Sequence, residues 1–458
     1  MRHVFIGVVI LSVTIFFFSC EREVPTSTEN IQSIPVVQQG AKNSETDVMP
    51  SGGGMNYSLT DYYLVEYSGS ETQMKSAVSL VDGSINDVFS EVNIAKVSGI
   101  DDAKAKILSK VKGIKTVTRD MNVQWIKPSE EIFADHIGEN ESFWAYQWGP
   151  VAISAPQAWD AGYTGQGVRV AVIDGGISSN HLDLVDNIDF NYSTSFVAGM
   201  NFDEDTDEFR HASHVAGIIA AEDNGRGTIG VAPNATIISI KALDGGSGSF
   251  SAIIQGIIYA ATVADADIIN MSIGGYLAKN DDATHLKNVL IRVLSFANQL
   301  GVTVIASAGN EGIDMDHVGP WLHIPGDIKE AINVSATAPY YLENFDNPAS
   351  YTNYGQRVVD FAAPGGDFAA GIANDAIIAP GSVSEDGTLS YYWWASGTSM
   401  ATPHVAGVAA LIVEKYNHSL NPAQVEAVLR QSADDLGKPG NDDFYGQGRV
   451  NAYKAVMQ

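Results

Sequence analysis

Apolar runs separated by short, glycine-rich polar segments dominate the C-terminal part of the chain. Residues 168–173, 268–275 and 302–310 are rich in Val and Ile and lack the strict alternation of a half-exposed strand. Such runs are typical of strands that a parallel sheet buries on both faces. Two further apolar segments, 211–220 and 398–413, are long enough for buried helices. The pattern therefore predicts a large α/β domain with a mostly parallel central sheet.

A shorter region with mixed periodicity, residues 58–126, precedes this domain. Its pattern predicts a small α+β sandwich. The expected elements are a strand at 62–67, a helix at 71–81, a strand pair at 88–97, a helix at 102–111 and strands at 114–117 and 117–125. Residues 127–146 are polar and form a candidate processing linker between the two domains.

The first residues are typical of an export signal. Arg2 is followed by 15 mostly apolar residues, Val4–Phe18, which are too few for a comfortable membrane span but suit a signal-peptide core. Residues 1–20 are therefore expected to be a signal peptide. Residues 21–57 are rich in Ser, Thr, Asn and Gly, have no sustained apolar period, and are expected to form a flexible tether.

Cys20 is the only cysteine, so the chain cannot form an intrachain disulfide. Its position directly after the apolar run resembles a bacterial lipoprotein signal, in which the cysteine is lipidated after cleavage. Phe17 departs from that pattern, which prefers an aliphatic residue there. Three fates stay open: lipidation of Cys20, cleavage nearby without lipidation, and an uncleaved anchor.

Length and charge narrow the functional classes. A chain of 458 residues with 45% hydrophobic content can build two or three domains and at least one large core. Its 26 basic and 54 acidic residues give a formal charge of −28, which argues against nucleic-acid partners and general adhesion to anionic membranes. The acidity also suits an exported protein or calcium ligands, although a solubilising surface explains most of the carboxylates.

Three polar groups stand at the ends of apolar segments. Asp174 follows the run 168–173, His211 opens an apolar helix with His214 one turn later, and Ser399 stands at another helix entrance. A carboxylate, an imidazole and a hydroxyl near a helix dipole are the groups that nucleophilic catalysis needs. Taken singly, each has a structural alternative: a turn aspartate, a metal-binding or packed histidine pair, and an N-cap serine.

The three blocks Asp174–Gly176, His211–Gly217 and Gly397–His404, in this order, resemble the active-site blocks of the subtilisin-like serine proteases (subtilases, peptidase S8). The resemblance runs from about Gln147 to the C-terminus. It implies a subtilisin-like three-layer catalytic domain over 147–458, a propeptide at 58–126 and processing within 127–146. The implied protein is a secreted bacterial endopeptidase, made as a self-processing zymogen and monomeric, in the extracellular space or cell envelope, with an outer-membrane lipoprotein as one form.

The resemblance assigns roles to particular residues. Ser399 is the expected nucleophile, His211 the general base and acid, and Asp174 the orienting carboxylate, with no catalytic cofactor. Asn310 and the Ser399 N–H are expected to form the oxyanion hole. The substrate, a protein or peptide, would bind as an extended strand. Its expected contacts are Ser272, Ile273 and Gly274 along the backbone, and Ser307, Ala308 and Gly309 around the first side-chain pocket. The propeptide is expected to be an intramolecular inhibitor.

A structural calcium ion is the cofactor that the resemblance implies. The expected side-chain ligands are Gln147, Asp183 and Asn224, and the expected carbonyl ligands belong to Glu222, Arg226 and Thr228. The acidic run 203–208 is a second candidate, for which a solvated insertion is the alternative.

Three small-for-small departures keep other functions open. Gly175, Ala212 and Ser213 replace residues that are more common beside the aspartate and the histidine, so hydrogen bonds around these groups could be lost. One alternative is a catalytically weak or silent surface-binding protein on the same fold. Another is a metallohydrolase that uses His211 and His214, which would be indifferent to Ser399→Ala.

Overall fold

The computed structural model describes residues 57–124, 130–133, 143–204, 206–207 and 209–458. The predicted signal at 1–20, Cys20 and all of the predicted tether except Tyr57 lie outside these residues. No helix within the described parts is long and apolar enough to cross a membrane.

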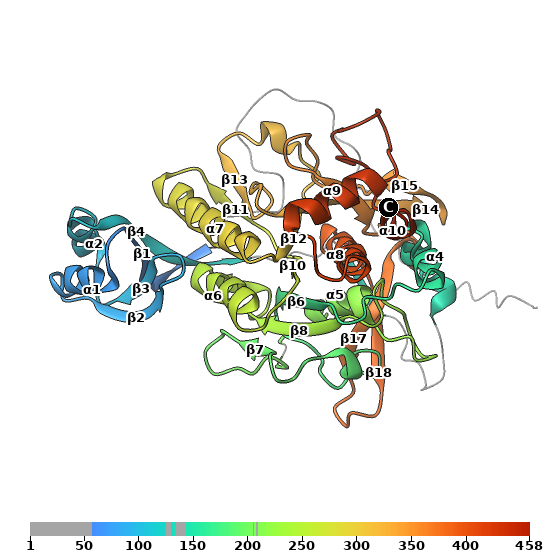
Figure 1. Ribbon diagram of the computed structural model, residues 1–458, viewed down its shortest axis with the longest axis horizontal. Helices are drawn as coiled ribbons and strands as arrows, with labels where there is room; N and C mark the ends of the chain where they lie inside the picture. The colour runs from blue at the N-terminus through green and yellow to red at the C-terminus, as the bar shows by residue number, and fades with distance from the viewer. Residues whose placement is uncertain (1–56, 125–129, 134–142, 205, 208) are drawn as a thin grey trace, which may run out of the picture. The chain divides into compact units, whose positions relative to one another are not determined.

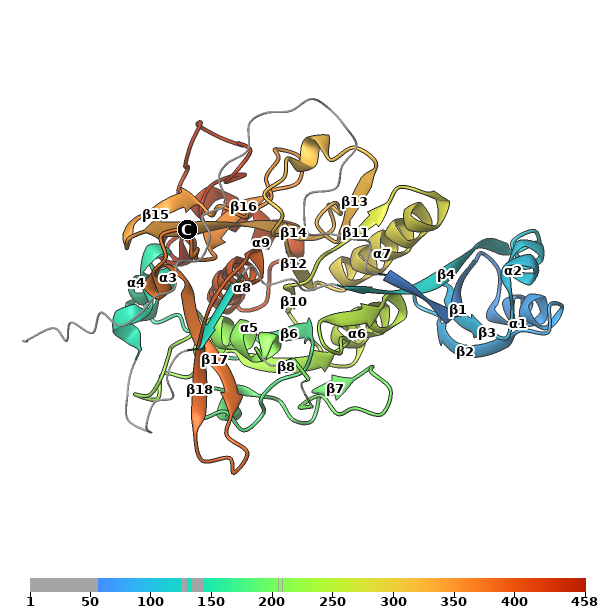
Figure 2. The same ribbon diagram turned by 180° about the vertical axis from the view of Figure 1, so that it is seen from behind.

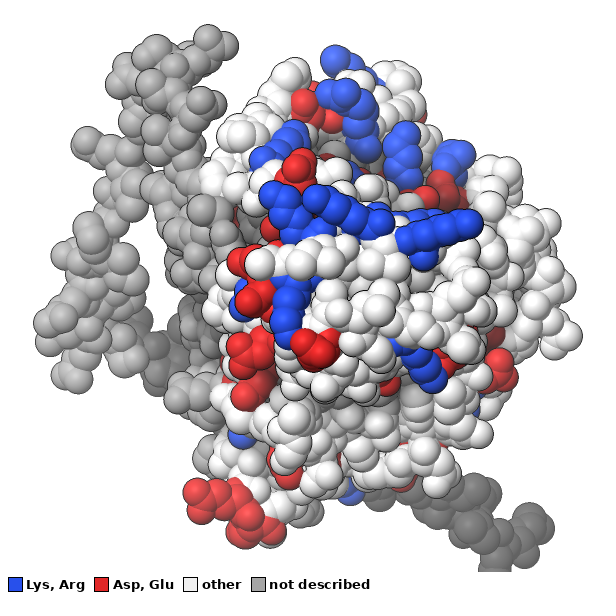
Figure 3. All heavy atoms as spheres, turned by 90° about the vertical axis from the view of Figure 1, so that its left-hand side faces the viewer, with Lys and Arg blue, Asp and Glu red and all other residues white. Residues whose placement is uncertain are grey.

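The small α+β domain is present, but the two strands predicted at 114–117 and 117–125 form one strand in the described residues. It contains β1 (Tyr57–Tyr67), α1 (Glu71–Ser79), β2 (Ser84–Phe89), β3 (Ile94–Ser98), α2 (Asp102–Leu108) and β4 (Ile114–Gln124). The two helices cover the sheet around a core that includes Val65, Val78 and Leu108. Ser70 caps α1 in a capping box with Gln73, which fixes the start of that helix. Lys and Arg side chains gather on the face shown in Figure 3, in contrast to the net negative charge of the chain as a whole.

The large domain is built on a mostly parallel sheet. Its strand order is β15-β14-β12-β10-β6-β8-β7, with β16 also paired to β14, and only the β14–β15 pair is antiparallel. The strands are β6 (Arg169–Asp174), β7 (Thr194–Ser195), β8 (Thr236–Lys241), β10 (Ile268–Met271), β12 (Thr303–Ser307), β14 (Ile332–Tyr340), β15 (Glu343–Pro348) and β16 (Phe361–Pro364). The predicted sheet is therefore confirmed.

Helices cover both faces of this sheet (Figures 1 and 2). Val170 and Val172 of β6 face one core with α5 (His211–Ala220) and α8 (Thr398–Lys415). Ala171 and Ile173 face the other core with α6 (Phe250–Thr262) and α7 (Asp281–Gln299). Burial on both faces explains why the strand sequence is continuously apolar. The three-layer α/β fold is confirmed.

Shorter elements complete the domain. They are α3 (Trp148–Ala152), α4 (Ala155–Asp160), α9 (Pro422–Ser432) and α10 (Ala452–Val456), a pair β11 (Gly275–Ala278) and β13 (Trp321–Ile324), and the hairpin β17 (Ile377–Val383) and β18 (Ser390–Ser396). The backbone of β5 (Glu130–Phe133), from the predicted linker, pairs antiparallel with β18. This part of the linker is therefore a strand.

Two central strands are shorter than the apolar runs predicted. Strand β10 ends at Met271, and β12 ends at Ser307. Ser272–Gly274 and Ala308–Asn310 consequently lie in loops just beyond the carboxyl ends of neighbouring parallel strands. This edge is where open α/β sheets usually bind ligands.

Candidate active site

Ser399 lies in the first turn of α8 and is 6% exposed. Pro403, four residues later, has no N–H to donate to the Ser399 carbonyl. That carbonyl instead accepts a hydrogen bond from Ser272 Oγ at 2.8 Å, and Ser399 Oγ donates to Ser272 O at 3.1 Å. The proline therefore leaves one backbone hydrogen bond of α8 unmade, at the position where the loop after β10 binds the helix.

Asp174 and His211 form a buried pair at the ends of β6 and α5. His211 Nδ1 lies 2.8 Å from Asp174 Oδ2, and each side chain is 1% exposed. The other carboxylate oxygen, Oδ1, accepts the N–H of Gly175 at 2.6 Å. A carboxylate held in this way fixes the imidazole orientation and favours the tautomer with the proton on Nδ1.

The departures from the family pattern leave hydrogen bonds in place. Gly175 still binds Asp174 through its backbone N–H. Ser213 Oγ accepts the Ser178 N–H at 2.8 Å, so this hydroxyl ties α5 to the segment after β6. Ala212 is buried in the helix packing.

His214 is a packing residue in the structure. Its Nε2 lies 3.2 Å from Ile377 O and 3.1 Å from Trp393 O, so the nitrogen carries a proton that it donates to these carbonyls. Burial lowers the pKa of His214 to about 3. The described residues contain no group of three His, Cys, Asp or Glu side chains that could hold a metal ion. This geometry gives the metallohydrolase alternative no support.

Asn310 is oriented by Thr398, which directly precedes Ser399. The amide oxygen Oδ1 of Asn310 accepts both the Thr398 N–H and the Thr398 hydroxyl, each at 2.8 Å. Because both donors fix the oxygen, the amide nitrogen takes the opposite side of the group. The Thr398 hydroxyl also accepts the Gly309 N–H at 3.1 Å. Thr398 was not among the predicted site residues, although it lies within the serine block.

The two predicted substrate-binding segments face each other. Ser307 Oγ donates to Ile273 O at 3.2 Å and so joins the loop after β10 to the end of β12. Asn353, which the sequence did not single out, fixes the next residues through its Nδ2, which donates to Ala308 O at 2.9 Å, and its N–H, which donates to Gly309 O at 3.0 Å. The structure therefore brings the predicted residues of both segments together beside Ser399.

The last strand of the small domain pairs with an edge of the large domain. Strand β4 runs antiparallel to β9 (Ser247–Ser249), with Gln124 opposite Ser247 and Asn122 opposite Ser249. Strand β9 includes the end of the glycine-rich segment 241–248, which begins at the end of β8. An extended segment of the chain itself therefore occupies the β9 edge.

Polar contacts reinforce this interface. Asp120 of β4 is 0% exposed and accepts the Ser251 hydroxyl at 2.7 Å, and burial raises the pKa of Asp120. Glu66 of β1 pairs with Arg292 of α7 at 2.6 Å. Leu64, Phe89 and Met121 of the small domain share the apolar core of α6 and α7.

The loop expected to bind calcium gathers around Asp183. Oδ2 of this buried carboxylate accepts the Thr228 N–H at 2.8 Å and the Thr228 hydroxyl at 3.3 Å. The Glu222 N–H donates to Asp183 O at 2.9 Å. The side-chain amide of Asn224 donates to the carbonyl of Leu182, the residue before Asp183, at 3.1 Å. Residues from both ends of the loop thus meet at Asp183.

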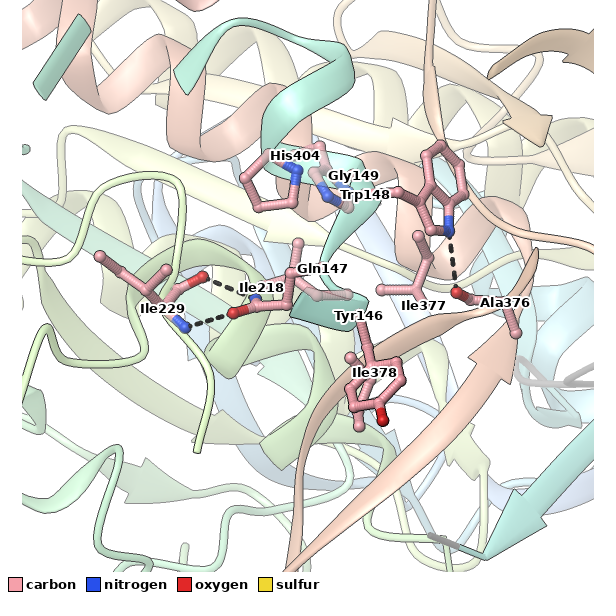
Figure 4. Close-up of a pocket in the computed structure, with 11 residues that line it drawn as sticks. Tyr146, Gln147, Trp148, Gly149, Ile218, Ile229, Ala376, Ile377, Ile378 and His404 are labelled. Atoms are coloured by element: carbon pink, nitrogen blue, oxygen red, sulfur yellow. Dashed lines mark hydrogen bonds between the residues drawn. The ribbon is translucent and has the colours of Figure 1, made fainter. Parts of the chain in front are cut away.

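Gln147 joins this loop from the start of the large domain. Its side chain accepts the Ile229 N–H at 2.9 Å and donates to Ile229 O at 3.0 Å (Figure 4). The Asn224 side-chain oxygen accepts the Arg226 N–H at 3.0 Å. Each amide oxygen uses one lone pair in this way and keeps a second for a ligand.

The environment of the buried Asp183 carboxylate shows whether these residues suit a calcium ion. Asp183 Oδ1 is buried and has no hydrogen-bond partner among the described residues. Burial raises the pKa of Asp183 to about 7. A cation at this oxygen would restore the ionised form, and the surrounding amide and carbonyl oxygens are the ligands that Ca²⁺ prefers. The residues present therefore fit a calcium ion.

Asp207, in the described part of the acidic run 203–208, stabilises the start of α5. Asp207 accepts the N–H groups of Phe209 and His211, each at 3.2 Å, and so satisfies donors at the start of α5. Asp205 and Glu208 lie outside the described residues.

The fold and these groups define a three-layer α/β protein that carries the functional groups of a serine hydrolase beyond its strand ends. Residues 165–448 match the subtilase family, peptidase S8. Thermitase from Thermoactinomyces vulgaris is 36% identical over 321 residues, covering 69% of this chain and 97% of thermitase. Subtilisin E from Bacillus subtilis (strain 168) is 35% identical over 391 residues, covering 85% of this chain and 87% of subtilisin E. The chain therefore belongs to the subtilase family, and its activity class is that of a subtilisin-like serine peptidase.

Solved structures agree on the fold. The epidermin leader peptide processing serine protease from Staphylococcus aureus aligns with a TM-score of 0.70 at 24% identity, covering 86% of this chain and 97% of that protein. A lanthipeptide protease aligns with a TM-score of 0.61 at 28% identity, covering 68% of this chain and 94% of that protein.

Proposed function

We propose that the chain is a serine endopeptidase that cleaves proteins through an acyl-enzyme on Ser399. His211 takes the Ser399 proton during attack and later gives it to the leaving amine, while Asp174 holds the imidazole and stabilises its charged form. The observation that carries the proposal is the 2.8 Å contact between His211 Nδ1 and Asp174 Oδ2 within a subtilase chain. The Ser399 hydroxyl must turn from Ser272 O to His211 for attack, so its hydrogen bond at 3.1 Å is a resting contact.

The tetrahedral intermediate would be stabilised by two donors, the Asn310 side-chain amide and the Ser399 N–H. The way Thr398 holds the Asn310 oxygen supports this role, because it directs the NH₂ group away from Thr398. Substrate backbone would pair with Ser272–Gly274, which leaves β10 and lies beside the nucleophile.

The small domain would serve as propeptide and intramolecular inhibitor. Two features support this: β4 occupies the β9 edge, and buried contacts at Asp120 and Glu66 hold the domain on α6 and α7. The Phe143 N–H donates to Gly227 O at 2.5 Å and Gln147 binds Ile229, so residues from 143 onward belong to the large domain. The processing cut, expected within 127–146, would therefore fall before Phe143.

The chain from Glu21 onward is expected to shorten itself in calcium buffer, while its Ser399→Ala variant stays whole. Intact mass measured over time would reveal the cut, since only an active serine removes the propeptide. A parent that stays whole would exclude self-processing under these conditions. Identical cleavage of both chains would assign the cut to another protease.

Calcium would bind at Asp183 with the amide oxygens of Gln147 and Asn224 and carbonyls from Glu222, Arg226 and Thr228. The ion would cross-link the loop after α5 to the start of the large domain, a structural role. The orphaned Asp183 Oδ1 supports it.

Removal of calcium is expected to lower the apparent melting temperature by about 5 °C. At a calcium concentration about 100-fold above Kd, binding contributes about 2.7 kcal/mol to the native state. Scans with calcium or EGTA, in the Ser399→Ala background to prevent autolysis, would measure the shift. Asp183→Asn should remove the calcium dependence, while the exposed Asp186→Asn should retain it. If the parent and the Asp186→Asn variant melt at the same temperature in EGTA as in calcium, the result would contradict the proposed calcium site.

Export through residues 1–20, with lipidation of Cys20 as an anchor, completes the proposal. It is supported by the apolar run Val4–Phe18 and the adjoining cysteine.

A further inference from the structure

The proposed pocket for the substrate residue before the cleaved bond would lie between two backbone segments that each contain a glycine. Gly274 ends the segment beside Ser399, and Gly309 lies on the facing segment. Ser307 Oγ joins the two segments by its bond to Ile273 O. Glycines at both walls would ordinarily leave room for a large substrate side chain.

His323 occupies the space beside Gly274, and it shares the space beside Gly309 with Asn353 and Glu311. A Cβ atom on Gly274 would lie 2.6 Å from His323 Nε2, and a Cβ atom on Gly309 would lie 3.1 Å from the same nitrogen. The imidazole therefore stands between the two walls, where it is 1% exposed. Nδ1 of this ring is buried and has no hydrogen-bond partner among the described residues.

The surrounding residues hold the ring in this position. Strand β13 places His323 opposite Tyr276 of β11, and the two ring centroids lie 4.7 Å apart. The Tyr276 hydroxyl donates to Glu311 Oε2 at 2.7 Å, and Asn353 donates to the same oxygen at 2.9 Å. A Cβ on Gly326 would lie 2.1 Å from His323 Nδ1, so the backbone closes the other side of the ring.

The histidine supplies bulk rather than charge. Burial lowers the pKa of His323, although the carboxylates of Glu311 and Asp327 oppose that shift. A neutral imidazole offers a substrate cation no repulsion and no ionic partner. Its effect on selection is therefore mainly steric.

We infer that His323 fills the base of the first side-chain pocket and restricts the residue before the cleaved bond to small side chains such as Ala and Ser. This inference rests on the proposed peptidase function. Leu or Phe would have to displace a packed ring, and overfilling a packed site is unfavourable. A mismatch of one methylene in such a pocket changes kcat/KM by about 10–200-fold.

The test uses the processed enzyme and a peptide series that varies only at this position. Ala and Ser peptides are expected to be cleaved with kcat/KM at least about tenfold above Leu and Phe peptides. Equal or faster cleavage of Phe peptides would overturn the inference. A peptide counts as a substrate only if the parent enzyme cleaves it and the Ser399→Ala variant does not. If the parent cleaves no peptide in this way, the proposed function fails, and the inference with it.

His323→Gly should open the pocket. The ratio of Phe to Ala cleavage is expected to rise at least about tenfold, because the ring no longer occupies the space. Retained cleavage of the Ala peptide shows that the variant is folded, and His285→Ala on α7 serves as the matched histidine control. An unchanged ratio in a variant that cleaves the Ala peptide would overturn the inference. If His323→Gly cleaves no peptide, the rates of the parent enzyme on the Ala, Ser, Leu and Phe peptides decide whether the inference holds.

Discussion

Ser399→Ala is expected to reduce kcat for peptide hydrolysis by about 10⁶-fold, the loss that removal of the equivalent serine causes in subtilisin. The variant keeps the Ser272 Oγ bond to the Ser399 carbonyl and loses the 3.1 Å bond from the hydroxyl. The fold should therefore survive, and circular dichroism with kinetics on the same sample would separate activity from stability.

Ser432→Ala is the matched control for this change. Ser432 is a buried serine of α9 whose hydroxyl donates to Val428 O at 2.8 Å, and it has no part in the site. This variant should cleave peptides at the parent rate. Substantial peptide hydrolysis by Ser399→Ala would refute the nucleophile assignment.

Asp174→Asn is expected to lower kcat by about 10⁴-fold with little change in substrate binding, as the same replacement does in trypsin-like enzymes. An asparagine that keeps its hydrogen bond from Gly175 N would present its NH₂ group to His211 Nδ1. Two donors cannot face each other, so the imidazole would adopt the tautomer that cannot take the Ser399 proton. Steady-state kinetics measure both parameters.

Asp160→Asn, at the exposed end of α4, is the control for loss of one negative charge. It should leave kcat unchanged. A rise in KM with unchanged kcat for Asp174→Asn would show that the carboxylate contributes to binding and not to the chemical step.

The sequence predicted the large sheet, its helices and the small domain because burial determines which positions along the chain are apolar. The run 168–173 is continuously apolar since helices cover both faces of β6. The pairing of Asp174 with His211 was expected from the order of the blocks, and the structure places them in contact. Their catalytic roles, those of Ser399 and Asn310, and the calcium ligands stay predictions.

Contacts between loops were not predictable from the pattern. Asn353 fixes Ala308 and Gly309 across a long stretch of sequence, and no periodicity marks it. His323 meets Gly274 and Gly309 only through the pairing of β11 with β13. The early ends of β10 and β12 were also missed, because their apolar runs continue into the loops that form the site.

Covalent labelling tests the central claim most directly. A fluorophosphonate should react with the processed enzyme by forming a bond from Ser399 Oγ to phosphorus and releasing fluoride, as the serine transfers its proton to His211. Digestion and mass spectrometry are expected to find the adduct on the peptide that contains Ser399, at one label per chain, and none in Ser399→Ala. An adduct on a different residue, or an unlabelled enzyme that still cleaves peptides, would contradict the mechanism.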